Sequence, residues 1–223
     1  MADREDWCAV STEREKQAVA EAAALLVKDG MRVGLGTGST VRYLLPALAA
    51  RRLSIRCVAT SDRTASQAAE LGLPVEPFST LDALDIVIDG ADQIAPDGWL
   101  VKGGGGAHTR EKIVAAAGDR FVVIADSGKP TLALHPPVPL ELVEFGLPAT
   151  LRLLGHVTLR EAPRSPDGGV IADYTAPFTN PAELAARLSA TPGVIDHGLF
   201  GPDLVSVILV GRGEEVEQRT LRT

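Results

Sequence analysis

Short apolar segments that alternate with helical segments constrain the fold of this chain more than any other feature. The apolar segment 31–35 runs into a glycine-rich turn at 36–40, and a helical pattern follows over 41–51. The order is repeated by an apolar segment at 54–60 and a helical segment at 61–71. Strands and helices that alternate at this spacing predict a parallel sheet with helices on both faces.

Further elements extend this pattern. Thr12 and Glu15 have capping-box spacing, which predicts a first helix from Thr12 to Gly30. Core strands are expected at 85–88 and 121–125, with a helix at 109–117 between them, and the apolar segment 204–210 is expected to return to the same sheet. Ligands bind such sheets beyond the carboxyl ends of the strands.

A second pattern begins after a cluster of prolines between residues 130 and 139. Its expected strands are 140–144, 155–160, 169–174 and 194–200, and its expected helices are 147–154 and a segment opened by Asn180-Pro181. The order β-α-β-β-α-β is ferredoxin-like. We therefore expect an α/β sheet domain over 1–136 and 201–223, and a ferredoxin-like (α+β) domain over 137–200.

Composition excludes several classes of protein. A net charge of −7 disfavours nucleic-acid binding. Cys8 and Cys57 form no disulfide framework and no C-x-x-C pair, which favours a reducing cytoplasm. The charged N-terminus is unlike a signal peptide, and no apolar run approaches the roughly 20 residues that span a bilayer. We expect a cytoplasmic protein with no nucleic-acid or membrane partner.

The turn Gly36-Thr37-Gly38-Ser39-Thr40 is the first candidate site. Its glycines allow the backbone to approach a ligand, and the start of the next helix offers N–H donors to a phosphate. The turn is neither a dinucleotide fingerprint nor a Walker loop. The alternative is a tight turn with a helix cap.

Two acids follow the strand at 85–88. Asp89 and Asp92 belong to the sequence Asp-Gly-Ala-Asp and could hold sugar hydroxyls or Mg²⁺. The alternative is an ordinary Asp-Gly turn.

The four successive glycines at 103–106 form the segment whose ordering costs the most backbone entropy. Because glycine loses much backbone entropy on ordering, such a loop is expected to lie against a ligand. Lys102 supplies a cation at one end, and Glu111 in the following helix supplies a candidate base. The alternative is a flexible surface hairpin. His108 is assigned no role, and the four histidines share no ligand-like spacing, so no metal site is expected.

A fourth cluster, 126–129, adds Lys129 at the same sheet edge. Together the clusters offer a phosphate site, two carboxylates, a lysine and a separate glutamate base. This set suits proton abstraction beside the carbonyl of a phosphosugar, with Lys102 and backbone N–H groups stabilising an enediolate.

The motifs also resemble a known family. Over essentially the whole chain, the order GTGST (36–40), SD (61–62), DGAD (89–92), KGGGGAHTREK (102–112) and ADSGK (125–129) is similar to that of type A ribose-5-phosphate isomerases. The separations of 13 residues from Asp89 to Lys102 and 9 residues from Lys102 to Glu111 agree with the family pattern.

The resemblance implies a Rossmann-like domain with a ferredoxin-like lid, a homodimer or tetramer, and a reaction without metal or cofactor. The substrate would be D-ribose 5-phosphate, converted to D-ribulose 5-phosphate in the non-oxidative pentose phosphate pathway. Site residues are carried over position by position. Thr37, Gly38, Ser39 and Thr40 would bind phosphate with Lys16 and Lys129; Asp89, Gly90, Ala91 and Asp92 would bind the sugar and assist ring opening; Lys102, Gly103, Gly104 and Gly105 would stabilise the enediolate; and Glu111 would carry the proton.

Three positions depart from the family pattern. Gln93 replaces a glutamate, His108 replaces an apolar residue, and the turn 167–169 lacks an asparagine. We expect Gln93 to alter the charge near the site, and His108 to complicate the pH profile.

Three rival functions remain at this point. A sugar-phosphate sensor would keep the 36–40 turn, but usually has an N-terminal pair of DNA-binding helices and does not need Lys102 or Glu111. A sugar-phosphate deaminase is the second rival. A metal-dependent hydride-shift isomerase is the third.

Overall fold

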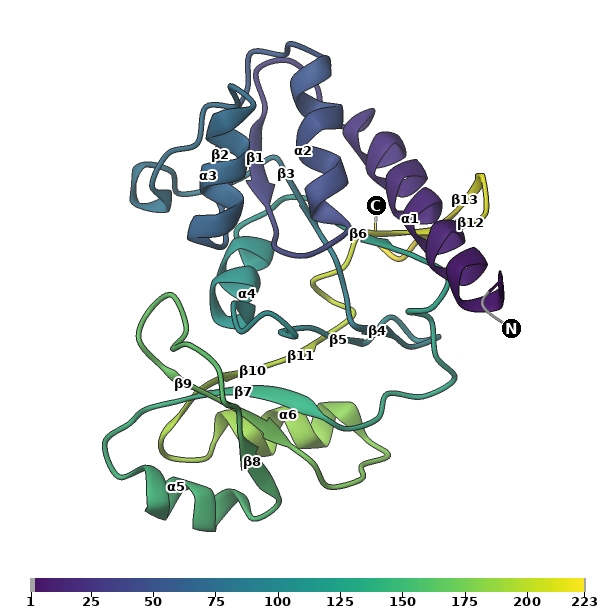
Figure 1. The fold of residues 1–223 in the computed structure, drawn as a ribbon. Coiled ribbons are helices and arrows are strands. Elements are labelled where there is room, and N and C mark those ends of the chain that lie inside the picture. The colour runs from purple at the N-terminus through teal and green to yellow at the C-terminus, as the bar shows by residue number, and fades with distance from the viewer. Residues whose placement is uncertain (1–2, 223) are drawn as a thin grey trace. The chain divides into compact units, whose positions relative to one another are not determined.

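The computed structural model describes residues 3–222 of the chain, and the side chains of residues 12–222. The chain divides into two compact units (Figure 1). Unit 1 comprises residues 1–90, 113–129 and 203–223, and unit 2 comprises residues 91–112 and 130–202. Each unit is described by itself.

Unit 1 contains a six-stranded sheet in the order β13-β12-β6-β3-β1-β2. Its strands are β1 (Arg32–Leu35), β2 (Arg56–Ala59), β3 (Ile86–Asp89), β6 (Phe121–Ala125), β12 (Val207–Arg212) and β13 (Glu215–Thr220). All neighbouring strands pair in parallel except the edge strand β13, which pairs antiparallel with β12. The predicted parallel sheet is confirmed, and so is the return of the last apolar segment to it. The polar edge strand β13 was not predicted.

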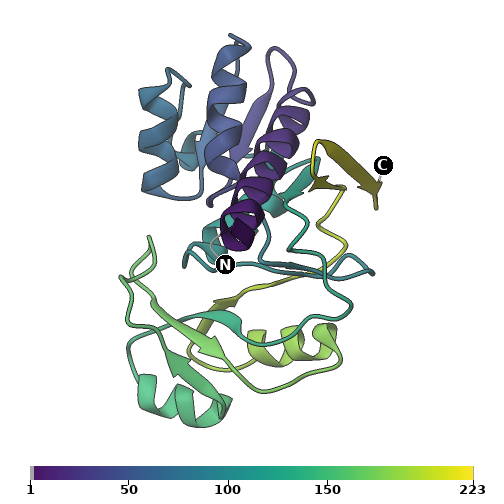
Figure 2. The same cartoon turned by 45° about the vertical axis from the view of Figure 1, so that its right-hand side comes forward.

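Helices cover both faces of this sheet. The helices of unit 1 are α1 (Asp3–Ala24), α2 (Val41–Ala50) and α3 (Asp62–Glu70), the 3₁₀ helix η1 (Phe78–Thr80), and the C-terminal half of α4 (His108–Ala116), which begins in unit 2. Helices α1 and α2 lie side by side on one face (Figures 1 and 2).

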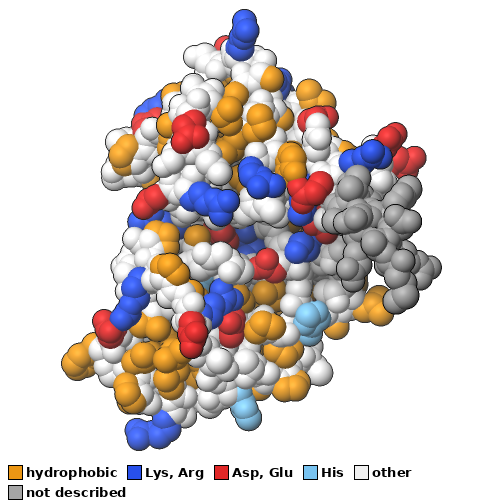
Figure 3. Space-filling view, in the orientation of Figure 1, with side chains coloured by type: hydrophobic (Ala, Val, Ile, Leu, Met, Phe, Trp, Pro, Cys, Tyr) orange, Lys and Arg blue, Asp and Glu red, His pale blue; other side chains and the backbone are white. Residues whose placement is uncertain are grey.

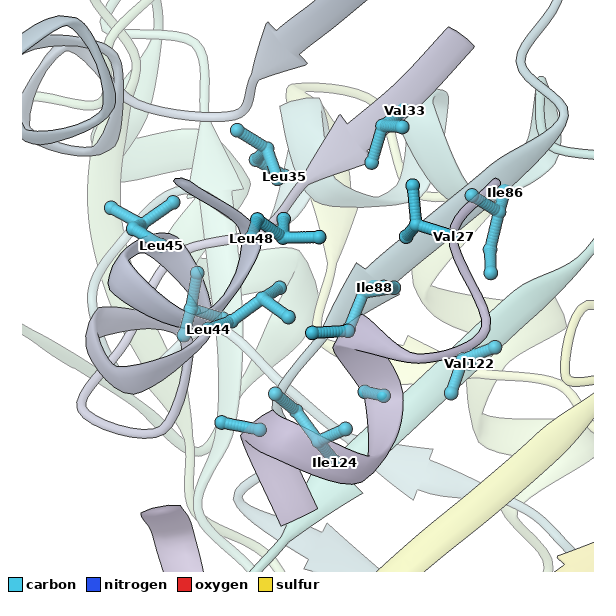
Figure 4. Packing of buried hydrophobic residues seen from close by; sticks show 14 of the residues in the cluster. Val27, Val33, Leu35, Leu44, Leu45, Leu48, Ile86, Ile88, Val122 and Ile124 are labelled. Carbon is cyan, nitrogen blue, oxygen red and sulfur yellow. The ribbon is translucent and has the colours of Figure 1, made fainter. Parts of the chain in front are cut away.

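The core of unit 1 forms where alternate strand residues meet these helices. Val33 and Leu35 of β1 pack in one cluster with Leu44 and Leu48 of α2 (Figure 4). Gly34 lies between them in the strand and so faces the opposite side, where Val114 of α4 occupies the space that a Cβ atom would need. Burial on both faces explains why the strands are apolar at nearly every position.

The first helix differs from its prediction. It begins at Asp3 and ends at Ala24, not at Thr12 and Gly30. Glu15 forms no capping box; its buried carboxylate accepts hydrogen bonds from the backbone N–H groups of Ser127, at 2.9 Å, and Gly213, at 3.0 Å. The local spacing was therefore misleading, because the partners of Glu15 are more than 100 residues away in sequence.

Unit 2 contains the predicted ferredoxin-like arrangement. Its elements are β7 (Val138–Leu142), α5 (Leu147–Leu154), β8 (Val157–Leu159), β9 (Val170–Tyr174), α6 (Pro181–Ser189) and β10 (Val194–His197). The strands form an antiparallel sheet in the order β10-β7-β9-β8, in which β9 separates the two strands joined by α5. Helix α6 begins as predicted, with the Asn180 side chain accepting from the N–H of Glu183.

A small third sheet distinguishes the observed units from the expected domains. It contains β4 (Gln93–Ile94), β5 (Leu100–Val101) and β11 (Leu199–Phe200) in the order β11-β5-β4. We expected residues 91–112 to group with the large sheet. They group instead with unit 2, because β5 pairs with β11 near the end of that unit.

Candidate active site

The turn after β1 lies at the topological switch point of the large sheet. The parallel strands have the order β2-β1-β3-β6-β12, so connections from β1 and β3 leave in opposite directions. Ligands of open parallel sheets bind at the carboxyl ends of such a pair of strands. The β1–α2 loop (residues 36–40) and Asp89, the last residue of β3, occupy these two ends.

Asp89 fixes the β1–α2 loop. Its side chain is 1% exposed, and its Oδ1 accepts hydrogen bonds from the backbone N–H groups of Thr37, at 3.0 Å, and Gly90, at 2.7 Å. A Cβ atom on Gly36 would lie 1.9 Å from the Asp89 carboxyl group. Glycine is therefore required at position 36 for the close approach of the two strand ends.

The start of α2 offers backbone donors to an anion. The N–H groups of Gly38, Ser39 and Thr40 have no hydrogen-bond partner among the described residues, and Thr40 makes no side-chain cap. Gly38 and Ser39 are exposed. Unpaired N–H groups at a helix N-terminus are the usual setting for a bound phosphate.

Hydroxyl groups surround the other side of this loop. The Oγ1 of Thr37 lies 2.8 Å from the Oγ1 of Thr60 and donates to the Oγ of Ser61 at 2.8 Å. Ser61 also caps α3, and the Oγ1 of Thr64 donates to the carbonyl of Gly36 at 3.0 Å. Roles for Thr60 and Thr64 were not predicted from the sequence. Their only signal was a run of hydroxyl residues between β2 and α3.

The two lysines expected near the phosphate differ in their contacts. Lys16 on α1 pairs with Glu13 at 2.8 Å, and Glu13 also accepts from the hydroxyl of Tyr43 on α2. The hydrogen bond from Lys16 is the largest cause of a lowered pKa at Glu13. Lys129 makes no side-chain hydrogen bond or ion pair within residues 12–222.

Unit 2 holds the proposed catalytic pair. The Nζ of Lys102 lies 3.2 Å from Oε2 of Glu111, and their side chains are 3% and 4% exposed. Lys102 follows β5, and its N–H donates to the carbonyl of Gly198 at 2.8 Å. Its ammonium also lies 5.4 Å from the centre of the Phe200 ring. A pair of opposite charges that is buried in contact is the strongest indication of a functional site among the described residues.

The glycine loop (residues 103–106) follows Lys102 directly. Gly103 has φ +103°, and a Cβ atom there would lie 2.7 Å from Nδ1 of His108. The N–H of Gly104 donates to Oδ2 of Asp92 at 2.8 Å. Gly104 and Gly105 are exposed, whereas Gly103 and Gly106 are buried. The loop is thus an ordered turn whose two middle residues are accessible, and not the flexible surface hairpin that the sequence left open.

His108 serves packing against this loop. Its side chain is fully buried, and burial lowers its pKa to about 4. The imidazole is therefore uncharged at neutral pH. This low pKa disfavours a contribution of His108 to the pH profile near neutral pH, and the expectation itself stays a prediction.

The other two departures also have local explanations. The amide of Gln93 donates to the carbonyl of His135 at 2.9 Å and accepts from the N–H of the same residue at 2.9 Å. An ionised glutamate could not make both bonds, so Gln93 has a structural role here, and its effect on the charge near the site stays a prediction. The Asp167 carboxylate accepts two hydrogen bonds, at 2.8 Å each, from the side chain of Arg110, which lies in the first turn of α4. This pair lowers the pKa of Asp167.

The candidate residues thus form two sets. Unit 1 contains the β1–α2 loop, Asp89, Gly90 and both additional lysines, and unit 2 contains Ala91, Asp92, Lys102, the glycine loop and Glu111. The chain passes from the first set to the second between Gly90 and Ala91.

Among the described residues, no group of three or more His, Cys, Asp or Glu side chains is arranged to hold a metal ion. None of the helices in that part of the chain combines the length and apolar character needed to cross a membrane. Figure 3 shows charged side chains of both signs among the described residues.

Comparisons with known proteins agree on one family. Residues 56–215 match the family model of ribose 5-phosphate isomerase A (phosphoriboisomerase A). The chain is 44% identical to ribose-5-phosphate isomerase A of Caulobacter sp. strain K31, over 93% of this chain and 98% of that protein. It is 42% identical to the Halobacterium salinarum protein of that name, over 94% and 96% of the two chains.

Solved structures give the same result. Ribose 5-phosphate isomerase A from Neisseria gonorrhoeae superposes with a TM-score of 0.88 at 32% identity, covering 93% of this chain and 96% of that one. A D-ribose-5-phosphate isomerase in complex with phospho-erythronic acid also gives 0.88, at 30% identity, covering 94% and 99%.

Proposed function

Because the chain belongs to the ribose-5-phosphate isomerase A family, whose members interconvert ribose 5-phosphate and ribulose 5-phosphate, we propose that Glu111 is the base that moves the proton between C2 and C1. The observation that supports this role is the buried contact between Glu111 and Lys102. Glu111 is held in the first turn of α4, where the helix dipole also favours a carboxylate.

The proposed reaction uses both members of the pair. The carboxylate of Glu111 removes the proton from C2 of the open-chain aldose, and negative charge develops on the oxygen at C1. The Lys102 ammonium and N–H groups of the glycine loop stabilise this charge. Return of the proton to C1, with transfer of the O2 hydroxyl proton to O1, gives the ketose. One well-placed donor of this kind contributes about 2.7 to 4 kcal/mol to a barrier.

The remaining residues bind the substrate in this proposal. The N–H groups and hydroxyls of Thr37, Gly38, Ser39 and Thr40 hold the phosphate, and Lys16 and Lys129 add positive charge. Asp89, Gly90, Ala91 and Asp92 contact the sugar and assist ring opening. Since Asp89 already accepts two backbone N–H groups, its main effect is to fix the loop that binds the phosphate.

The rival functions are less well supported by the same site. A sugar-phosphate sensor has no use for a buried lysine and glutamate in contact, and the identities to the isomerases also disfavour a deaminase. Retention of a C2 deuterium label in the product would favour the hydride-shift rival.

The decisive experiment is an assay with ribose 5-phosphate that carries deuterium at C2. We expect purified protein to form ribulose 5-phosphate after EDTA treatment and to exchange the label with solvent. Titration with phospho-erythronic acid is expected to show competitive binding. Failure to form ribulose 5-phosphate would contradict the proposal, and ammonia release from an amino-sugar phosphate would favour the deaminase.

Two expectations about the cellular context are also proposals. We propose that the protein works in the cytoplasm and assembles as a homodimer or tetramer. Cell fractionation and light scattering of the purified protein test these two statements separately.

A further inference from the structure

Arg160, which follows β8, directs its guanidinium group at two targets in unit 2. Its Nε and Nη2 donate to the two carboxylate oxygens of Asp173 on β9, at 2.7 Å each. Its Nη1 donates to the carbonyl oxygens of Gly103 and Gly104, at 3.0 Å each. The two side chains are 20% and 19% exposed. The planar fork of arginine suits such a set of fixed acceptors.

These bonds fix two peptide planes in the glycine loop. In a trans peptide, the carbonyl of one residue and the N–H of the next lie in one plane and point in opposite directions. The bond to the Gly103 carbonyl therefore sets the direction of the Gly104 N–H, which donates to Asp92 at 2.8 Å. The bond to the Gly104 carbonyl likewise sets the direction of the Gly105 N–H.

The N–H of Gly105 is available to a ligand. It has no hydrogen-bond partner among the residues that the structure describes, and Gly105 is exposed. Its direction is opposite to that of a carbonyl already held by a cation, so the loop presents a donor on the side away from Arg160. Donors that are aimed before the reaction begins stabilise developing charge without reorganisation.

The glycine loop needs a contact from a side chain outside the loop to fix its peptide planes. Four successive glycines allow wide rotation of each peptide plane. The only hydrogen bond within the loop that the structure shows joins the N–H of Gly106 to the carbonyl of Gly103, at 3.0 Å, and it leaves the 104–105 peptide unfixed. Arg160 supplies the missing constraint.

We propose that Arg160, held in place by Asp173, is a positioning residue that aims the Gly105 N–H at the substrate oxygen on which negative charge develops. The proposal rests on the proposed role of the glycine loop. It assigns to Arg160 no contact with the substrate.

The test compares Arg160→Ala and Arg160→Lys with a matched control, Arg164→Ala. Arg164 lies in the same connection between β8 and β9 and pairs with Glu144, and among the described residues it makes no hydrogen bond to a glycine of the loop. For each variant we would measure kcat and KM for ribose 5-phosphate, and Kd for phospho-erythronic acid, whose carboxylate places a negative oxygen near the sugar carbon chain.

We expect Arg160→Ala to lower kcat about 10- to 100-fold. KM is expected to stay within about threefold, and Kd for the acid to weaken about fivefold or more. Arg160→Lys should give an intermediate loss, because an ammonium group lacks the fork that holds Asp173 and two carbonyls together. Arg164→Ala should match the wild-type enzyme.

The Kd for phospho-erythronic acid distinguishes a loss of loop positioning from a loss of folded protein. A smaller folded fraction would lower the apparent kcat without changing Kd, so a kcat loss with unchanged Kd would overturn the proposal. Wild-type kcat in Arg160→Ala, or an equal loss in the control, would also overturn it. If Arg160→Ala fails to fold, Asp173→Asn takes its place, and an unchanged kcat and Kd in that variant would contradict the proposal. An inactive wild-type protein would instead contradict the proposed function.

Discussion

The β1–α2 loop of unit 1 and the glycine loop of unit 2 both present backbone N–H groups, but opposite charges hold them. In the first loop a carboxylate, Asp89, accepts the N–H of Thr37, and the helix that follows leaves further N–H groups unpaired. In the second loop a guanidinium group, Arg160, donates to two carbonyls. Backbone N–H groups can thus be presented by a helix N-terminus, or by a side chain outside the loop that orients single peptide planes.

This difference predicts that the two loops affect different kinetic constants. The first loop presents unpaired N–H groups at a helix N-terminus and suits the constant charge of a phosphate. The second lies beside the buried Lys102–Glu111 pair and suits charge that appears only during the reaction. Changes in the first loop should therefore act mainly on KM, and changes in the second mainly on kcat.

The largest effect is expected from Glu111→Gln. Loss of the carboxylate removes the proposed base, so kcat should fall by about 10²- to 10⁴-fold while KM changes little. Steady-state kinetics measure both. Glu183→Gln, at an exposed position of α6, is the control. Near-normal turnover of Glu111→Gln would remove this glutamate from the mechanism.

Lys102→Met should be the next most severe change. It leaves the Glu111 carboxylate buried without its cation, which typically destabilises a protein by about 3 to 5 kcal/mol. Adding Glu111→Gln should restore part of this stability, because the uncompensated charge is then gone. Urea unfolding of the two single variants and the double variant measures the coupling. Additive effects would show that the two side chains do not interact in solution.

The two loops can be compared directly with one alanine in each. Gly36→Ala places a methyl group against Asp89 and should raise KM about 10-fold or more by displacing the phosphate-binding loop. Gly103→Ala places one against His108 at a positive φ and should lower kcat by a similar factor. Gly72→Ala, which has a positive φ but no neighbour within 4 Å, controls for backbone strain alone. If both variants change KM and kcat by the same factors, the predicted difference between the two loops is wrong.

The smallest effect concerns stability and pH in unit 2. Burial lowers the pKa of His108 to about 4, and burial together with the Lys112 charge lowers that of His197 to about 3. The unfolded chain binds protons on these residues below about pH 6.5, whereas the folded chain does not. Stability should therefore be complete above that pH and fall as the pH drops, by at most about 1.4 kcal/mol per pH unit for each histidine.

Urea unfolding between pH 7 and pH 5 measures this dependence. His108→Leu should reduce the slope, whereas His156→Leu, at an exposed position, should leave it unchanged. A slope unaffected by His108→Leu would show that the histidine is not held neutral in the folded state.

Much of this molecule follows from local patterns. The period and length of the apolar segments predicted the parallel sheet and the ferredoxin-like unit, because each pattern reports which faces of an element are buried. Lys102, the glycines and Glu111 were proposed as site residues because such residues have few other uses at that spacing. The first helix was predicted with the wrong bounds. The role of Glu15 was missed because the N–H groups that bind its carboxylate come from distant segments.

Local patterns along the chain were enough to indicate the family, the two folding patterns and the candidate reacting groups, because all of these depend on neighbours in sequence. The folded structure was needed to show that Asp89 fixes the β1–α2 loop, that Gln93 pairs with His135 and that Arg160 donates to two carbonyls of the glycine loop. The physical reason is that a hydrogen bond depends on direction and distance in space. Residues 52, 42 and 56 positions apart come together only when strands pair and the chain folds back on itself.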